Sequence, residues 1–204
     1  MIFIFSLLGV SGCASSLDRS TDYKGDDAGN LVLSLGVSNE EMQAYSPMLS
    51  GRKIETKDPI ELTYEPPRHG EKILLDIPFT DGAGKVIVRR LPPGKYQIDQ
   101  YHFSISNDEV RISNKLVTPV VFSISSGQTA YIGSVYLYMK NVGSEEKNKT
   151  PVIQLDGKTQ TYMRMQAEVT DEQERDIANA KSSHPDMNIE TVTNFVPKQK
   201  KVGL

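Results

Sequence analysis

Three histidines are the first candidates for chemistry in this sequence, because imidazole can act as a base or a metal ligand near neutral pH. They are His69, His102 and His184. None lies at metal-ligand spacing from another histidine or from the single cysteine. His69 and His184 fall in polar segments and are expected to be exposed. His102 is expected on the polar face of a strand, between Tyr101 and Phe103. The spacing predicts no metal site.

Serine and carboxylate chemistry has equally little support. A serine hydrolase needs a serine, a histidine base and an orienting carboxylate, and the chain contains no G-x-S-x-G motif. Ser38 and Ser144 stand in the turn-like contexts L-G-V-S and V-G-S. The pairs Asp26–Asp27 and Glu145–Glu146 fall in expected loops, where solvated charge is the usual role. Two acids distant in sequence, as glycosidases use, remain open. We expect no catalytic residue, no cofactor and no enzymatic activity.

Cys13 is the only cysteine, and it ends an apolar N-terminal run. Residues 1–10 read M-I-F-I-F-S-L-L-G-V. This run is as long as the apolar core of a signal peptide and falls short of the roughly 20 residues of a membrane-spanning helix. Small residues then precede the thiol as V-S-G-C. The pattern resembles the lipobox of bacterial lipoproteins, in which the cysteine is lipidated and becomes the first mature residue.

The resemblance implies that residues 1–12 are a signal peptide and that Cys13 carries two or three acyl chains. Each buried CH₂ contributes about 0.8 kcal/mol, and two or more chains make the attachment to a membrane durable. Ala14 stands where lipoproteins retained in the inner membrane often carry Asp. The implied location is therefore the outer membrane, on its periplasmic side. The alternative is a strand or buried helix that ends in a free cysteine.

Composition limits the remaining choices. The 204 residues carry a formal net charge of −3 and no Trp. A nucleic-acid binder is expected to show a basic stripe, and the chain has only a short basic tail, K-Q-K-K, at 198–201. Once Cys13 is lipidated no thiol remains, which excludes a cysteine nucleophile, a thiolate metal site and a disulfide. The domain must then be held together by its core.

The aromatic residues give the most suggestive group for binding. Tyr136 and Tyr138 lie two apart in an expected strand, so both rings point to one face. There they can form a platform for a glycan, a peptide or a protein partner. The alternative is that these rings, together with Tyr101, Phe103 and Tyr131, are core or cross-strand packing.

The elements that would position these residues are mostly strands. Residues 13–30 read as the lipidated cysteine and a flexible tether with a reach of about 20–25 Å. From residue 31 to residue 204, apolar and polar residues alternate with period two in several runs, as in antiparallel sheets packed on one face. The alternation changes phase near Asp99-Gln100, which predicts a β-bulge. In one run, Tyr131, Gly133, Val135 and Leu137 are expected to share a face.

A single helix is predicted near 171–181, with Thr170 as its N-cap and Gln173 completing a capping box. Its apolar face is thin, chiefly Ile177 and Ala180, so it must dock against the sheet to persist. Pro185 ends it, and the chain up to Val196 is expected to return as a last strand.

The segment L-P-P-G-K-Y-Q-I at 91–98 resembles a junction of prealbumin-like sandwich domains, such as carboxypeptidase-regulatory-like modules and repeats of bacterial surface proteins. Pro93 presets φ in this turn, and Gly94 supplies the positive φ that follows. The expected fold is an antiparallel β-sandwich, prealbumin- or immunoglobulin-like. The expected function is a non-enzymatic, lipid-anchored envelope protein that binds a protein partner or scaffolds an assembly. A surface adhesion module and an envelope hydrolase acting on glycan or cell wall are the alternatives.

Overall fold

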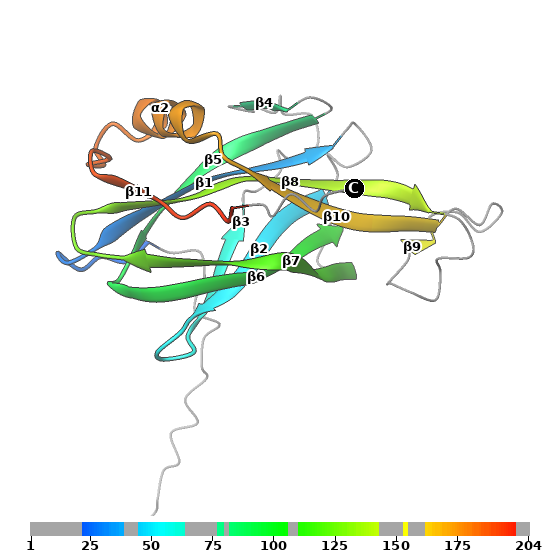
Figure 1. The fold of residues 1–204 in the computed structure, drawn as a ribbon, viewed down its shortest axis with the longest axis horizontal. Helices are drawn as coiled ribbons and strands as arrows, with labels where there is room; N and C mark the ends of the chain where they lie inside the picture. Colours follow the sequence, from blue (N-terminus) through cyan, green and yellow to red (C-terminus); the bar gives the residue numbers. More distant parts are fainter. Residues whose placement is uncertain are drawn as a thin grey trace, which may run out of the picture.

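The computed structural model describes residues 22–38, 45–63, 77–79, 82–105, 110–142, 153–154 and 162–198. Within these ranges two β-sheets face each other, and one helix, α2 (Gln173–Ser183), covers the outer face of the larger sheet (Figure 1). The expectation of a mainly β, sandwich-like protein with one short C-terminal helix is confirmed. The helix begins and ends two residues later than predicted.

The larger sheet has seven strands in the order β4-β5-β1-β8-β10-β9, and the short β11 also pairs with β8. Its strands are β1 (Gly29–Ser38), β4 (Ile77–Phe79), β5 (Gly82–Leu91), β8 (Thr129–Val142), β9 (Ile153–Gln154), β10 (Tyr162–Thr170) and β11 (Val192–Asn194). The smaller sheet has the order β3-β2-β6-β7. Its strands are β2 (Tyr45–Lys53), β3 (Pro59–Thr63), β6 (Gly94–Ile105) and β7 (Val110–Ile124).

The larger sheet is mixed, so the prediction of purely antiparallel sheets is wrong. β8 runs parallel to β1, from Asn30 beside Thr129 to Val37 beside Leu137, and β11 also runs parallel to β8. The reason is the connection before β8. The chain leaves the smaller sheet at the end of β7, turns at residues 125–128 and enters the larger sheet at the end where β1 also starts. Two strands that start at the same end of a sheet are parallel.

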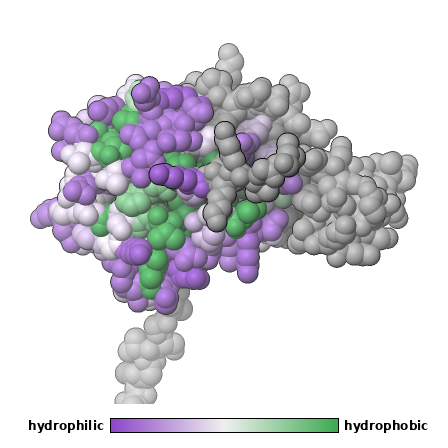
Figure 2. All heavy atoms as spheres, in the orientation of Figure 1, coloured by the Kyte–Doolittle hydropathy of each residue, from purple (hydrophilic) through white to green (hydrophobic). Residues whose placement is uncertain are grey.

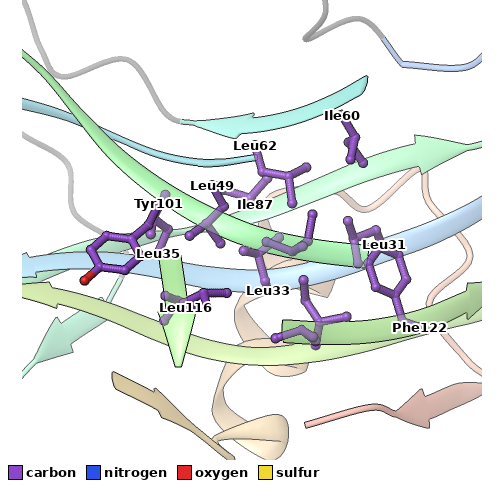
Figure 3. Close-up of a cluster of buried hydrophobic side chains, with 14 of the residues drawn as sticks. Leu31, Leu33, Leu35, Leu49, Ile60, Leu62, Ile87, Tyr101, Leu116 and Phe122 are labelled. Carbon is purple, nitrogen blue, oxygen red and sulfur yellow. The ribbon is translucent and has the colours of Figure 1, made fainter. Parts of the chain in front are cut away.

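The core between the sheets is formed by the residues that alternation placed on inward faces. Figure 3 shows leucine side chains of β1 and β2 packed against apolar and aromatic side chains of β3, β6 and β7, with the ring of Phe122 at one end. Leu31, Leu33, Leu35, Leu49, Leu62 and Ile98 are fully buried. Tyr101 also lies in this core, where its hydroxyl donates to the Met165 carbonyl of β10 at 3.0 Å and links the two sheets. On the face that Figure 2 shows, hydrophilic residues surround a smaller area of hydrophobic ones. Val117 and Val121 are the exposed large apolar residues of the described part.

Two bulges set which side chains face the core. The ladders of β6 with β2 and with β7 both change register between Ile98 and Gln100, so the bulge predicted near Asp99-Gln100 is confirmed. A second irregularity lies at Gly133, which has φ of +111° and interrupts the ladder of β8 with β1. It places Tyr131 on the opposite face from Val135 and Leu137. The prediction that these residues share a face is therefore wrong, because a single inserted residue reverses a period-two pattern.

The N-terminal boundary also differs from the prediction. Asp22 accepts a hydrogen bond from the backbone N–H of Arg90, and the N–H of Tyr23 donates to the Arg90 carbonyl. Gly29 and Asn30 already belong to β1, and the Asn30 side chain donates to the Asn188 carbonyl at 2.8 Å. Residues 22–30 are thus attached to the body rather than part of a tether. Small polar residues gave no sign of this, because the contacts are made largely by their backbone.

The outer face of the larger sheet carries a second apolar cluster under α2. Val32, Val86, Val88 and Tyr131 of the sheet pack against Ala180, with Ile177 beside them, as the predicted docking requires. The capping prediction is wrong. Thr170 is still paired with Ser134 in β10, so the N-cap is Glu172, which makes no capping bond through its side chain.

Candidate functional site

A buried polar network joins α2 to the larger sheet. The Asp176 carboxylate is fully buried and accepts hydrogen bonds from the hydroxyls of Ser34 and Tyr131, at 2.7 and 2.9 Å. The hydroxyl oxygens of Ser34 and Ser134 lie 2.8 Å apart, and because Ser34 gives its one hydrogen to Asp176, Ser134 is the donor in this pair. Arg175 pairs with Asp176 at 2.9 Å and donates to Ser134 at 3.0 Å. β1, β8 and α2 therefore meet through five polar side chains below the helix.

The charges of this network are balanced inside it. Asp176 faces the guanidinium of Arg175, whose side chain is 30% exposed while that of Asp176 is 0% exposed. Burial, and then the Asp176 carboxylate, raise the pKa of Tyr131 well above its usual range, so the phenol stays protonated and donates its hydrogen. Ser34, Tyr131 and Arg175 donate to the two carboxylate oxygens of Asp176, so neither buried acceptor is left unsatisfied. The network therefore attaches α2 to strands β1 and β8 of the larger sheet.

A hollow of about 540 Å³ opens at the N-terminal end of α2. Its walls are formed by Asp171, Glu172, Gln173, Glu174, Arg175 and Asn194. Asp171 is already bonded, since it accepts from the Gln173 N–H and from the Asn194 amide. All six lining residues are polar, and three of them, Asp171, Glu172 and Glu174, are acidic.

The two tyrosines proposed as a platform lie on the outer face of the larger sheet. Tyr136 and Tyr138 are partly buried, and their rings stack with centroids 5.9 Å apart. Their neighbours on β10 are Glu168 and Gln166. Neither ring belongs to the core between the sheets, whereas Tyr101 and Tyr131 are buried in the two apolar clusters. The sequence group of aromatic residues is thus divided among three places.

The other candidate residues named from the sequence lie in different settings. Asp26 and Asp27 are exposed in a turn before β1, as expected. His184 follows the helix and is partly buried, contrary to the expectation of an exposed residue, because its backbone N–H donates to the Ala180 carbonyl and keeps it against α2. Ser38 ends β1 rather than standing in a turn. Cys13, His69, Ser144, Glu145, Glu146 and the side chain of Phe103 lie outside the described part.

His102 lies in a setting that the sequence did not indicate. It is on the outer face of β6, as expected, yet only 4% exposed. Its ring nitrogens reach Ser50 of β2 and Ser113 of β7, at 2.5 and 2.6 Å. Ser50 is 52 positions away in the sequence, and no motif connects the two. Only knowledge of the β2-β6-β7 order would have found this group.

Two negative findings complete the description of the site. Over the residues that the structure describes, no three His, Cys, Asp or Glu side chains are grouped so as to hold a metal ion. In the same part of the chain, no helix is long and apolar enough to cross a membrane.

No protein-family description matches the chain, and a search of curated proteins finds no match. Function must therefore be inferred from the residues and their arrangement.

Proposed function

We propose that this chain is a lipid-anchored protein of the bacterial cell envelope whose sandwich binds a protein partner. The observation that carries the proposal is the small number of residues between the V-S-G-C pattern and Asp22, the first residue that the structure describes. Eight residues, 14–21, separate Cys13 from Asp22. A flexible chain of that length reaches about 15 Å. An acylated Cys13 would thus hold the body close to the bilayer.

The place where residues 22 and 23 contact the sandwich also suggests which end of it would face the membrane. Asp22 and Tyr23 bind Arg90 near the end of β5, and Ala28 accepts from Gly127 in the turn before β8. This end of the sandwich would face the membrane. β8 starts there, and Tyr136 lies seven residues further along, about 23 Å away at the rise of a strand. The stacked tyrosines therefore lie in the half of the sheet that would point away from the bilayer, where a periplasmic partner can reach them.

We also propose a specific fold type, a prealbumin-like sandwich, and a specific location, the periplasmic side of the outer membrane. A prealbumin-like sandwich is supported by the turn at 91–94, where Gly94 has the positive φ, +151°, that the resembling motif requires. Attachment to the outer rather than the inner membrane rests on Ala14 after the cysteine. The periplasmic side is part of the proposal. An adhesion-type module at the cell surface is the second candidate, favoured by the same turn. Proteolysis of intact cells separates the two, because only a surface module would be cut.

A photo-crosslinking experiment in native membranes tests the partner surface. A crosslinking amino acid replaces Gln166, which lies beside Tyr138 on β10, or Val121, which is exposed on the other sheet. We expect one protein adduct from position 166 and none from position 121. Adding Tyr136→Ser and Tyr138→Ser should reduce the adduct at least about tenfold, which corresponds to a loss of roughly 1.4 kcal/mol of binding free energy.

Two results would count against the platform. One is an adduct from position 166 that is equally strong with and without the two rings. The other is unfolding of the double serine variant, measured by circular dichroism, since the rings would then serve packing instead of recognition.

A further inference from the structure

The outer face of the smaller sheet holds an imidazole between two hydroxyl groups. His102 of β6 is a direct cross-strand neighbour of Ser113 of β7, and it reaches diagonally to Ser50 of β2. Nε2 lies 2.5 Å from the Ser50 hydroxyl oxygen, and Nδ1 lies 2.6 Å from that of Ser113. The ring is 4% exposed, Ser50 is partly exposed, and Ser113 is exposed.

The chemistry of imidazole decides how these bonds are arranged. A neutral ring has one N–H donor and one nitrogen that accepts. In either neutral tautomer, one of these two hydroxyls can give its hydrogen to the ring while the other accepts the ring hydrogen. Ser113 is exposed, so it can accept the Nδ1 hydrogen and donate its own to water. Nε2 then accepts the hydrogen of Ser50. This is the arrangement in which a histidine removes a proton from a serine nucleophile.

We propose that Ser50 is a nucleophilic serine, activated by His102 as its general base and accepting acyl groups from activated esters. Ser113 is a positioning residue that fixes the tautomer of the ring. The site lies on the smaller sheet, away from Tyr136 and Tyr138 on the larger one, so it is independent of the proposed partner surface.

The step balances with these groups alone. The Ser50 oxygen forms a bond to the carbonyl carbon of the ester while its proton moves to Nε2 of His102. The bond from carbon to the leaving oxygen then breaks, and that oxygen takes the proton from Nε2. The products are an ester on Ser50 and a free alcohol. Water can later release the acyl group by the same route in reverse.

Ser113 determines the expected rate. A hydroxyl on Nδ1, such as that of Ser113, stabilises the imidazolium less than a carboxylate at the same nitrogen does, and the loss of that carboxylate in serine proteases costs about 10⁴-fold in turnover. The site should therefore be acylated once and released slowly. Stoichiometric modification, rather than rapid hydrolysis, is the expected behaviour.

The test uses a fluorophosphonate probe, which reacts with activated serines, on the full chain. We expect one label per molecule, mapped to Ser50 by mass spectrometry and absent from Ser50→Ala. His102→Gln should slow labelling at least about 100-fold, the lower range of general-base contributions. Ser123→Ala is the matched control: Ser123 is exposed on the same face of β7 without a histidine beside it, and its loss should change nothing.

Ser113 separates a positioning role from a structural one. Ser113→Ala should slow labelling while the melting temperature stays unchanged. Ser113→Asp puts a carboxylate on Nδ1 at an exposed position and should label faster than Ser113→Ala by about tenfold or more. No label on the wild-type chain, or a label at another serine, would overturn the proposal. So would a label whose rate does not depend on His102 or on the residue at 113.

Discussion

Replacing Asp176 with alanine should lower the free energy of unfolding by about 3–5 kcal/mol, the cost of removing one partner of a buried ion pair. Asp176 is the only carboxylate in the network beneath α2, and it accepts from Ser34, Tyr131 and Arg175. Without it, two buried hydroxyls lose their acceptor and the guanidinium loses its counter-charge. The helix has a thin apolar face, and its N-cap residue, Glu172, makes no side-chain capping bond that could replace that attachment.

Urea denaturation of the wild-type and variant chains gives the difference in the free energy of unfolding, and limited proteolysis reports whether α2 has detached. Asp186→Ala is the matched control, because Asp186 is exposed just beyond the helix and should change stability by less than about 0.5 kcal/mol. Tyr131→Phe should cost less than Asp176→Ala, since it removes one donor and no charge. A loss below about 1 kcal/mol for Asp176→Ala would mean that apolar packing alone holds the helix.

Replacing Gly51 with alanine should lower the free energy of unfolding by about 3 kcal/mol or more and can prevent folding. The added methyl group would overlap with backbone atoms, which cannot move aside as a flexible side chain can. A Cβ atom at this position would overlap with the backbone carbonyl of Gln97 on the neighbouring strand. β2 and β6 are the middle strands of the smaller sheet, and their register shifts next to Gly51. A glycine at such a point permits the close backbone approach that the bulge requires.

The contrast with another glycine makes this prediction specific. Gly127 has φ of +68°, and a Cβ there would meet no atom within 4 Å. Gly127→Ala should therefore cost only the conformational strain of about 1–2 kcal/mol. Thermal unfolding of both variants gives the comparison. If Gly51→Ala is no less stable than Gly127→Ala, the backbones of β2 and β6 do not approach each other closely at Gly51, contrary to this prediction.

Local patterns predicted those parts of the fold that depend on neighbouring residues. Alternation placed Leu31, Leu33 and Leu35 on one buried face, and the phase change located the bulge at Asp99-Gln100. Ile177 and Ala180 were enough to require a docked helix, because a chain with so little apolar surface does not hold a helix alone.

The errors arise where distant segments determine local structure. Thr170 has the chemistry of an N-cap, but pairing with Ser134 keeps it in a strand. Gly133 reverses the faces of β8, and nothing in the alternating pattern shows that one residue is extra. Asp176 lies on a short, polar helix and gave no sign that it would be buried beside Ser34, 142 positions away.

The candidate sites also differ in whether they depend on local sequence or on distant segments. Tyr136 and Tyr138 could be placed together from their spacing alone, and the structure puts both on the outer face of the larger sheet. The group of Ser50, His102 and Ser113 could not be predicted, because it depends on which strands are neighbours. Strand order in a sandwich is set by long-range packing that a local pattern does not encode.

Mass spectrometry of the N-terminal peptide, from the protein purified out of its own membranes, decides whether the chain is lipid-anchored. We expect a peptide that begins at Cys13 and carries two or three fatty acyl chains. We also expect that Cys13→Ser leaves the chain unacylated and releases it from the membrane fraction. A peptide that begins at Met1, with an unmodified thiol at Cys13, would contradict the assignment to the envelope.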